Sequence, residues 1–166
     1  MIIGMRGHDF GRMEPRALAL AIREAGFEAT QLAFAKAFPA PAEQYMTPGA
    51  LSEIRSSFAG IVLPVMGCYV SASDRDPDVL AEAKARFKRS LSASVILGAG
   101  CVGTETTHFT FPESEREAAY ARLLDFTREV CAHAEQVHAL VGIEPVALHT
   151  LNTPELARRL IADVSI

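Results

Sequence analysis

The feature of this sequence that most constrains its fold is a regular alternation between short apolar runs and longer runs with helical periodicity. In the first helical run, Leu18, Ala21, Ile22 and Ala25 recur at the spacing of one helix face, and Gly26 follows as a C-terminal signal. Strands are predicted at residues 2–5, 29–34, 61–70, 101–105 and 141–146. Helices are predicted at residues 14–25, 50–58, 76–97 and 112–138, and from residue 153 onward.

The predicted helices and strands differ in how clearly they are bounded. Pro64 lies inside the third predicted strand, where a missing N–H is poorly tolerated, so we expect the regular part on one side of it. Thr153 is the expected N-cap of the last helix, and residues 35–49, with three prolines, are expected to form a loop. In the helix at residues 76–97, the expected buried face is Leu80, Ala83, Phe87, Leu91 and Val95. In the helix at residues 112–138, it is Tyr120, Leu123, Leu124, Thr127, Cys131 and Ala134. In the last helix, it is Leu156, Leu160 and Ile161.

Strands separated by single helices indicate parallel pairing through right-handed crossovers. We therefore predict an α/β fold of the parallel (β/α) TIM-barrel type. A complete barrel of this type needs about 250 residues, whereas this chain has 166 residues and shows five strand–helix units. We expect about five of the eight units, in a single partial TIM-barrel domain over residues 1–166.

Composition excludes several classes of function. Apolar residues make up 49% and charged residues 22%, which is typical of globular domains. The net charge of −4 argues against a general nucleic-acid binder, which needs a basic surface to replace counterions on phosphate. No apolar run reaches the ~18 residues of a membrane span, and the N-terminus does not resemble a signal peptide. The three cysteines lack paired spacing, so we expect a cytoplasmic protein with no membrane or nucleic-acid partner.

Parallel α/β folds place their active sites at the carboxyl ends of the strands, which makes Glu144 the most informative residue. It lies in an otherwise apolar strand, where a carboxylate either faces the barrel mouth or needs a partner in the core. Glu144 is therefore a candidate metal ligand or base, and the alternative is a buried carboxylate satisfied by backbone amides or an arginine. Glu105 lies at the end of the preceding strand and is a candidate site residue for the same reason. The alternative for Glu105 is a helix-entry or hydrogen-bonding role.

Four further candidates follow strands on the same expected rim. His8, His108 and His149 are each compatible with a surface loop when taken alone, but three histidines beside two carboxylates indicate a site. Cys68 follows the third strand and could be a nucleophile or a structural residue. From these positions we assign Glu144, Glu105 and His149 to catalysis, His8, Cys68 and His108 to substrate binding, and Glu144 also to metal binding.

Four segments carry a resemblance to a known family: residues 18–27, Gly67-Cys68-Tyr69, residues 97–106 and residues 142–155. Through them the chain resembles the sugar phosphate isomerase/epimerase group of xylose isomerase-like TIM barrels. The resemblance implies a divalent metal ion (Mn, Mg, Co or Zn) at the barrel mouth and proton transfer between adjacent sugar carbons through an enediolate. Glu144 matches the carboxylate ligand on the fifth strand of that family.

The same resemblance implies ligands that this chain does not supply. The family carries an Asp, a His and a Glu ligand on strands six to eight, so the ion could be absent from a chain of five units. The second acid/base glutamate of the epimerases has no counterpart, because no acidic residue lies between Glu144 and Glu155; His149 occupies that loop instead.

The leading functional prediction is a sugar or sugar phosphate isomerase/epimerase acting on a keto-sugar. Two alternatives remain: a metal-dependent apurinic endonuclease-like barrel, and a non-catalytic, truncated barrel that only binds sugar. The expected partner is a small-molecule sugar or sugar phosphate. We also expect a homo-oligomer, because an open arc leaves the first and fifth strands with unpaired edges and an uncovered inner face.

Overall fold

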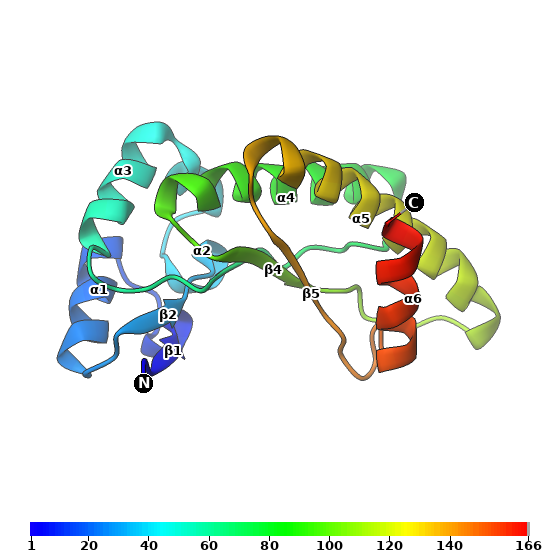
Figure 1. Ribbon diagram of the computed structural model, residues 1–166, viewed down its shortest axis with the longest axis horizontal. Coiled ribbons are helices and arrows are strands. Elements are labelled where there is room, and N and C mark those ends of the chain that lie inside the picture. The colour runs from blue at the N-terminus through cyan, green and yellow to red at the C-terminus, as the bar shows by residue number, and fades with distance from the viewer. Residues whose placement is uncertain (166) are drawn as a thin grey trace.

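The computed structural model describes residues 1–165, in which parallel strands form an open arc with helices along its outer side (Figure 1). The strands are β1 (Gly4–Arg6), β2 (Ala29–Gln31), β3 (Val65–Gly67), β4 (Cys101–Glu105) and β5 (Val141–Glu144). The α-helices are α1 (Pro15–Glu24), α2 (Phe34–Ala37), α3 (Pro48–Ser57), α4 (Pro77–Leu97), α5 (Arg116–Val137) and α6 (Pro154–Val164). Three short 3₁₀ helices are η1 (Gly7–Phe10), η2 (Ala42–Met46) and η3 (Glu113–Glu115).

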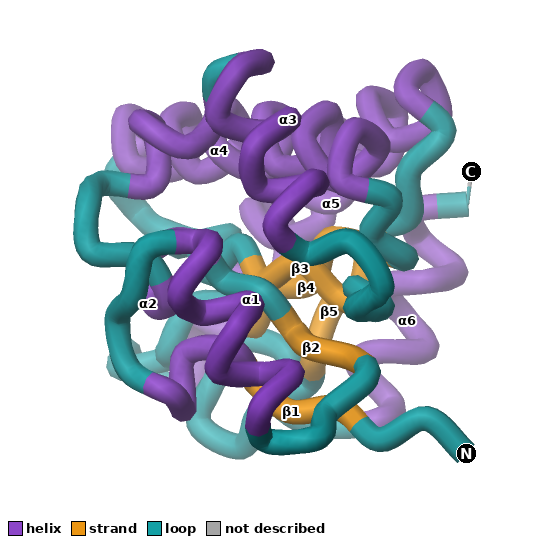
Figure 2. The backbone as a smooth tube through the Cα atoms, turned by 90° about the vertical axis from the view of Figure 1, so that its left-hand side faces the viewer, coloured by secondary structure: helices purple, strands orange, loops and turns teal. Residues whose placement is uncertain are grey.

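The strands follow one another in chain order. β1 pairs with β2, and β3, β4 and β5 form a second parallel group. Two parallel bridges, Ala29 to Val62 and Leu32 to Met66, connect β2 to the β3 segment, so the arc is continuous. Figure 2 shows the strands together beneath α3, α4 and α5. The predicted fold class, a partial parallel TIM barrel with five strands, is confirmed.

The strand boundaries differ from the predictions around the prolines. β3 begins directly after Pro64, as expected, but is shorter than the predicted 61–70, because only Val62 bridges on the other side of the proline. β2 ends at Gln31 instead of continuing to residue 34. The segment expected as a loop, 35–49, begins within α2 and contains η2, whose residues Ala42 and Tyr45 are buried.

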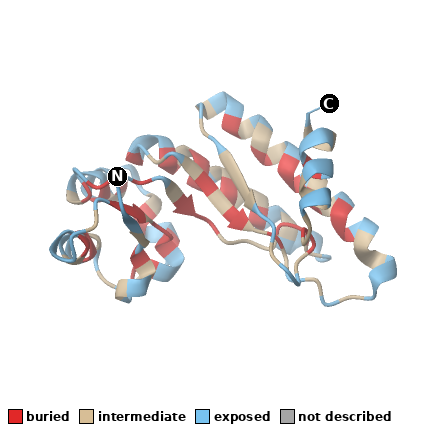
Figure 3. Cartoon of the chain, turned by 60° about the horizontal axis from the view of Figure 1, so that its bottom comes forward, coloured by how far each residue is buried: buried red, intermediate tan, exposed pale blue. Residues whose placement is uncertain are grey.

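The core lies between the outer side of the strands and the helices, as the buried positions in Figure 3 show. Phe87 of α4 and Phe126 of α5 meet there edge to face, with ring centroids 5.6 Å apart. Val95, expected on the buried face of α4, is 49% exposed instead. The expected positions follow one another in steps of four residues, and each such step turns about 40° beyond one full turn of the helix. At the end of α4 the face toward the core is therefore formed by Ser94 and Leu97 and no longer by Val95.

Similar corrections apply to the other helices. Ile161 is exposed, because five residues from Leu156 carry it around α6 to the far side. In α1 the buried positions are Leu18, Ala19 and Ile22, and Ala25 is exposed. In α5, Phe126 and Val130 are buried although the sequence did not single them out, while Leu124 and Cys131 are half-buried.

The start of α6 is confirmed in detail. The side chain of Thr153 accepts a hydrogen bond from the backbone N–H of Leu156, at 3.2 Å, as an N-cap does. Among residues 1–165, none of the helices combines the length and the apolar character that crossing a bilayer requires.

Candidate functional site

Alternation along β4 and β5 decides which side chains reach the inner, concave face of the arc. Val102 and Thr104 are buried on the helix side, which sends Glu105 to the concave side. On β5, Ile143 lines a cavity against α5 and α6, so Glu144 points the other way. Glu105 and Glu144 are register partners and therefore lie side by side. Two carboxylates thus meet at the carboxyl ends of neighbouring strands on the concave face, and Glu144 is exposed there.

Tyr69 continues this row beyond the end of β3. Its ring lies against Gly67, where an added Cβ would come within 3.0 Å of the ring, so any side chain there would push the ring back by a few tenths of an ångström. The Tyr69 hydroxyl accepts a hydrogen bond from Nε2 of Gln31 at 2.9 Å. Burial raises the pKa of Tyr69, and the negative charges of Glu105 and Glu144 act in the same direction. The phenol is therefore protonated at neutral pH and its ring stands between β2 and the two carboxylates.

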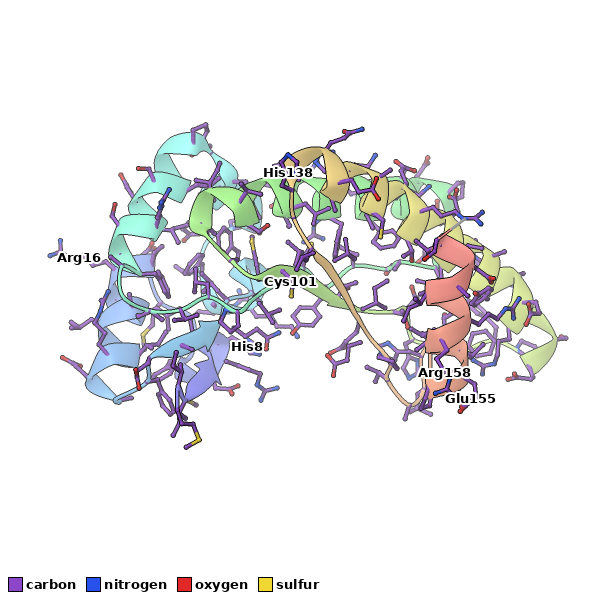
Figure 4. All side chains as sticks on the ribbon, in the orientation of Figure 1. His8, Arg16, Cys101, His138, Glu155 and Arg158 are labelled. Carbon is purple, nitrogen blue, oxygen red and sulfur yellow. The ribbon has the colours of Figure 1, made fainter. Side chains whose placement is uncertain are left out.

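His8 follows β1 in η1, and Figure 4 shows it projecting from the β1–β2 unit toward the centre of the arc. Burial lowers the pKa of His8, and the positive charges of Lys36 and Arg6 act in the same direction, while Asp9 opposes them. Its Nδ1 is buried and has no hydrogen-bond partner in the part of the chain that the structure describes. Because Nδ1 is shut off from solvent, only Nε2 of this neutral imidazole can donate to or accept from a bound ligand.

His108 and His149 are brought together by the loops that follow β4 and β5. The two residues form an isolated antiparallel bridge, and Phe109 N–H donates to the Leu148 carbonyl at 2.7 Å. Nδ1 of His149 is buried without a partner among the described residues. A second backbone hydrogen bond, from Thr150 N–H to the Thr107 carbonyl at 2.9 Å, fixes the two loops to each other.

A cavity of about 390 Å³ opens beside these groups. It connects the carboxyl ends of β3 and β4, and its lining includes Tyr69, Glu105 and His108. The structure therefore gathers five of the six predicted site residues along one rim, with His8 at the β1 end and His149 at the β5 end.

Cys68 is the sixth, and it lies elsewhere. It follows Met66 on the helix side of β3, is 8% exposed, and lines a cavity there together with Ser90 of α4. Burial raises the pKa of its thiol, so it is protonated at neutral pH. Tyr69, the next residue, takes the place on the concave face that the sequence analysis gave to Cys68.

Gln31 and Lys36 were not identified from the sequence. Lys36, in α2, holds its ammonium group 3.5 Å from the centroid of the Tyr69 ring. Gln31 is the last residue of β2 and could have been found by applying the strand-end rule to the second strand as well. Lys36 had no such signal, because α2 is a single helical turn inside a proline-rich segment.

The donor set fits a divalent cation only in part. Glu105 and Glu144 offer the carboxylate oxygens that hard cations prefer. Within residues 1–165, however, no three His, Cys, Asp or Glu side chains come together as a metal-binding group. These residues therefore provide part of a ligand shell.

A family model described as "xylose isomerase-like TIM barrel" matches residues 19–165. Among solved structures, the apo form of 3-keto-D-glucoside 4-epimerase from E. coli superimposes with a TM-score of 0.81 at 16% identity, over 99% of this chain and 65% of that one. The IOLI protein with a bound zinc atom superimposes with a TM-score of 0.77 at 18% identity, over 100% of this chain and 60% of that one. D-psicose 3-epimerase in the presence of D-fructose superimposes with a TM-score of 0.76 at 21% identity, over 99% of this chain and 60% of that one.

Identities of this size establish a shared fold alone. The chain spans 60% to 65% of the length of these three structures. No curated protein matches it in sequence.

Proposed function

Because this chain belongs to the xylose isomerase-like TIM barrel family, we propose that it carries the β1–β5 part of the active site of a sugar isomerase or epimerase. The reaction moves a proton between adjacent carbons of a keto-sugar. The observation that supports this proposal is the pairing of Glu105 and Glu144 on the concave face, at the carboxyl ends of β4 and β5.

Glu144 is proposed as a metal ligand, with Glu105 as its neighbour. Their oxygens suit Mn, Mg, Co or Zn, and further ligands would have to come from outside the residues described here. A divalent cation, when bound, supplies positive charge that polarises a carbonyl and favours loss of the neighbouring proton. One similar structure was crystallised with a zinc atom, which supports a metal-binding role for this rim.

The proton itself needs a group that accepts and returns it. Glu105 lies beside Glu144, and His149 lies in the loop that follows, so these two are the proposed acid/base residues. His8 and His108 are proposed to hold sugar hydroxyls, because imidazole nitrogens can donate or accept hydrogen bonds. Cys68, buried on the helix side, is proposed to serve packing.

The ligand class follows from the fold relatives and from the charge. Two of the similar structures are epimerases whose names specify a sugar or a glycoside. A small sugar suits a cavity of about 390 Å³. The net charge of −4 gives no support to a nucleic-acid substrate, so an apurinic endonuclease activity is not proposed.

Solvent deuterium exchange tests the proposal. The chain is incubated in D₂O with Mg²⁺, Mn²⁺ or Zn²⁺ and a panel of keto-sugars. The molecular mass of each recovered sugar is then measured by mass spectrometry. We expect one sugar to gain a deuterium, and Glu144→Gln to abolish the gain. The matched control is Glu24→Gln, which removes the same charge from an exposed position on α1. Absence of exchange with every keto-sugar and metal ion, or full exchange in Glu144→Gln, would contradict the proposal.

A further inference from the structure

The loops that follow β3, β4 and β5 meet in a buried cluster of hydroxyl groups. Oγ of Ser73, in the loop after β3, and Oγ1 of Thr150, in the loop after β5, share a hydrogen bond of 2.7 Å. The backbone N–H of Ser73 donates to Oγ1 of Thr107, in the loop after β4, at 2.8 Å. Ser73 and Thr150 are 2% and 1% exposed. Three segments that lie far apart in the sequence are therefore joined at one point away from solvent.

The cluster is anchored to the main chain and to a helix. Nε of Arg122, on α5, donates to the carbonyl of Ser73 at 3.0 Å. Oγ1 of Thr150 also donates to the carbonyl of Thr107, at 3.3 Å. Removing one of these groups would leave a buried partner unpaired, which costs more than the hydrogen bond itself contributes. We refer to Ser73, Thr107, Arg122 and Thr150 as the loop junction.

The loop junction is directly connected to the two histidines that bridge the β4 and β5 loops. Thr107 precedes His108 and Thr150 follows His149 in the sequence, and the two histidines form the antiparallel bridge. A backbone hydrogen bond of 2.9 Å, from the N–H of Thr150 to the carbonyl of Thr107, closes the pair of loops beside this bridge. The junction therefore holds the backbone from which both imidazoles project.

The ring of His149 has little else to orient it. Its Nδ1 is buried and has no hydrogen-bond partner within residues 1–165. A histidine that transfers a proton usually has its second ring nitrogen held by a carboxylate or a backbone carbonyl. The backbone of His149, in contrast, is held by the hydrogen bond from its own N–H to the carbonyl of Val146, at 3.0 Å, and by the junction at Thr150. The position of the ring therefore depends on the backbone, and the backbone depends on the loop junction.

We infer that the loop junction positions the proposed active site, and that Ser73 acts through its hydrogen bond to Thr150 to hold the imidazole of His149 where proton transfer requires it. This inference rests on the proposed function and adds to it three positioning residues, Ser73, Arg122 and Thr150. None of the three lines the cavity of about 390 Å³ that is proposed to receive the sugar. They act on the reaction only through the loops that they join.

Two substitutions at position 150 separate the role of the hydroxyl from that of the shape. Thr150→Val keeps the shape and loses both hydrogen bonds of Oγ1, whereas Thr150→Ser keeps the hydroxyl. Thr150→Val should lower solvent deuterium exchange at saturating sugar by a factor on the order of 10², the cost of misplacing a reacting group by about 1 Å. The affinity for the sugar, measured by calorimetric titration, should fall less than the rate. Thr150→Ser should exchange at close to the native rate.

NMR of the sugar-free chain, labelled with ¹⁵N-histidine, gives a readout that does not depend on the reaction. The imidazole signals of His149 should shift in Thr150→Val and return in Thr150→Ser, while those of His133 and His138, at the end of α5, stay in place. Ser73→Ala removes the same hydrogen bond from the other loop, so it should reproduce both effects and repeats the test if Thr150→Val does not fold. Combining the two substitutions should add little, as for residues that share one interaction.

The matched control is Thr127→Val. Thr127 is a buried threonine whose hydroxyl donates to the carbonyl of Leu123 within α5, at 2.7 Å. This substitution should leave the His149 signals and the exchange rate unchanged. The same losses in Thr127→Val would assign them to general destabilisation and overturn the inference.

The two readouts separate failure of the inference from failure of the proposed function. If Thr150→Val and Ser73→Ala keep either the native exchange rate or the native His149 signals, the inference is overturned and the proposed function stands. If the native chain exchanges deuterium into none of the sugars, the proposed function is overturned. The His149 signals then decide alone whether the loop junction positions the ring.

Discussion

The imidazole rings of His108 and His149 lie 5.6 Å apart, centroid to centroid, with their planes at 78°. This contact is a consequence of the backbone bridge between the loops that follow β4 and β5. It places His149 in the loop directly after Glu144, where the sequence offers no acidic residue before Glu155. The pair therefore occupies the position in which the proposed reaction needs its second proton-transfer group.

We predict that His149→Gln lowers solvent deuterium exchange into the sugar by a factor on the order of 10² to 10⁴, the usual contribution of a general acid/base. Glutamine keeps hydrogen-bonding capacity but cannot carry the proton. The companion variant His108→Gln should weaken sugar binding and slow the exchange less. Exchange at the native rate in His149→Gln would assign the proton transfer to Glu105 alone.

Cys68 provides a test of the two faces of β3. Because it packs on the helix side, Cys68→Ala should cost about 1 kcal/mol in the free energy of unfolding, the effect of deleting one buried heavy atom. The affinity for the sugar should not change. Urea denaturation and calorimetric titration measure the two quantities. A large loss of sugar affinity with unchanged stability would return Cys68 to the substrate site.

The contact between α5 and α6 predicts a pH dependence at the alkaline end. The Tyr120 hydroxyl donates to Asp163 at 2.6 Å, and burial, together with this carboxylate, raises the pKa of Tyr120 from 10.0 to about 12. The folded state therefore holds this proton more tightly than the unfolded state. The resulting stability is fully present below pH 10.0 and is lost as pH rises toward about 12.

Thermal unfolding of the native chain and of Tyr120→Phe between pH 7 and pH 12 isolates this effect. The thiols of Cys68, Cys101 and Cys131 also have raised pKa values, but both proteins share them. Tyr120→Phe should lose about 1 kcal/mol at neutral pH and show a shallower decline above pH 10. If the melting temperatures of the two proteins fell in parallel as pH rises, Tyr120 would have the same pKa in the folded and the unfolded state.

The predicted homo-oligomer follows from the two ends of the arc. Within residues 1–165, β1 pairs with β2 alone and β5 with β4 alone, and Ile3 and Leu140 beside them are 53% and 67% exposed. Sedimentation equilibrium at micromolar concentration should give a multiple of the 17.9 kDa chain mass. Introducing lysine through Ile3→Lys and Leu140→Lys should shift the protein toward monomer. A monomer that keeps its melting temperature on dilution would contradict this prediction.

The sequence predicted the fold well where one signal dominated. The face of Leu18 and Ile22 in α1 and the parallel order of the strands follow from periodicity alone. The site was predicted less completely, since the strand-end rule gives positions along the chain but not the face of the sheet. Cys68 and Tyr69 lie beyond the regular part of β3, so the alternation that sends Cys68 to the helix side and Tyr69 to the concave face could not be counted from the sequence.

Lys36 illustrates a second reason for the incomplete prediction of the site. Its place over Tyr69 depends on α2, a single turn in which Phe34 contacts Phe38 locally and Tyr45 of η2 through tertiary packing. No periodicity in the sequence predicts such a turn, because four residues are too few to show one. Contacts of this kind are visible only in three dimensions.

Glu105 and Glu144 themselves predict a link between metal binding and stability. Like charges at register positions of neighbouring strands repel, so Glu105→Gln and Glu144→Gln should each raise the metal-free stability by roughly 0.2–1 kcal/mol. A bound divalent cation relieves the same repulsion and stabilises the folded state by mass action. Mn²⁺ should therefore raise the melting temperature of the native chain, and EDTA should reverse the rise. Each Gln variant should melt higher than the native chain in EDTA and respond less to Mn²⁺, whereas Glu24→Gln should behave as native in both conditions. If the two variants were less stable than the native chain in EDTA, the carboxylates would be held by favourable partners, and this site would have no need of a cation.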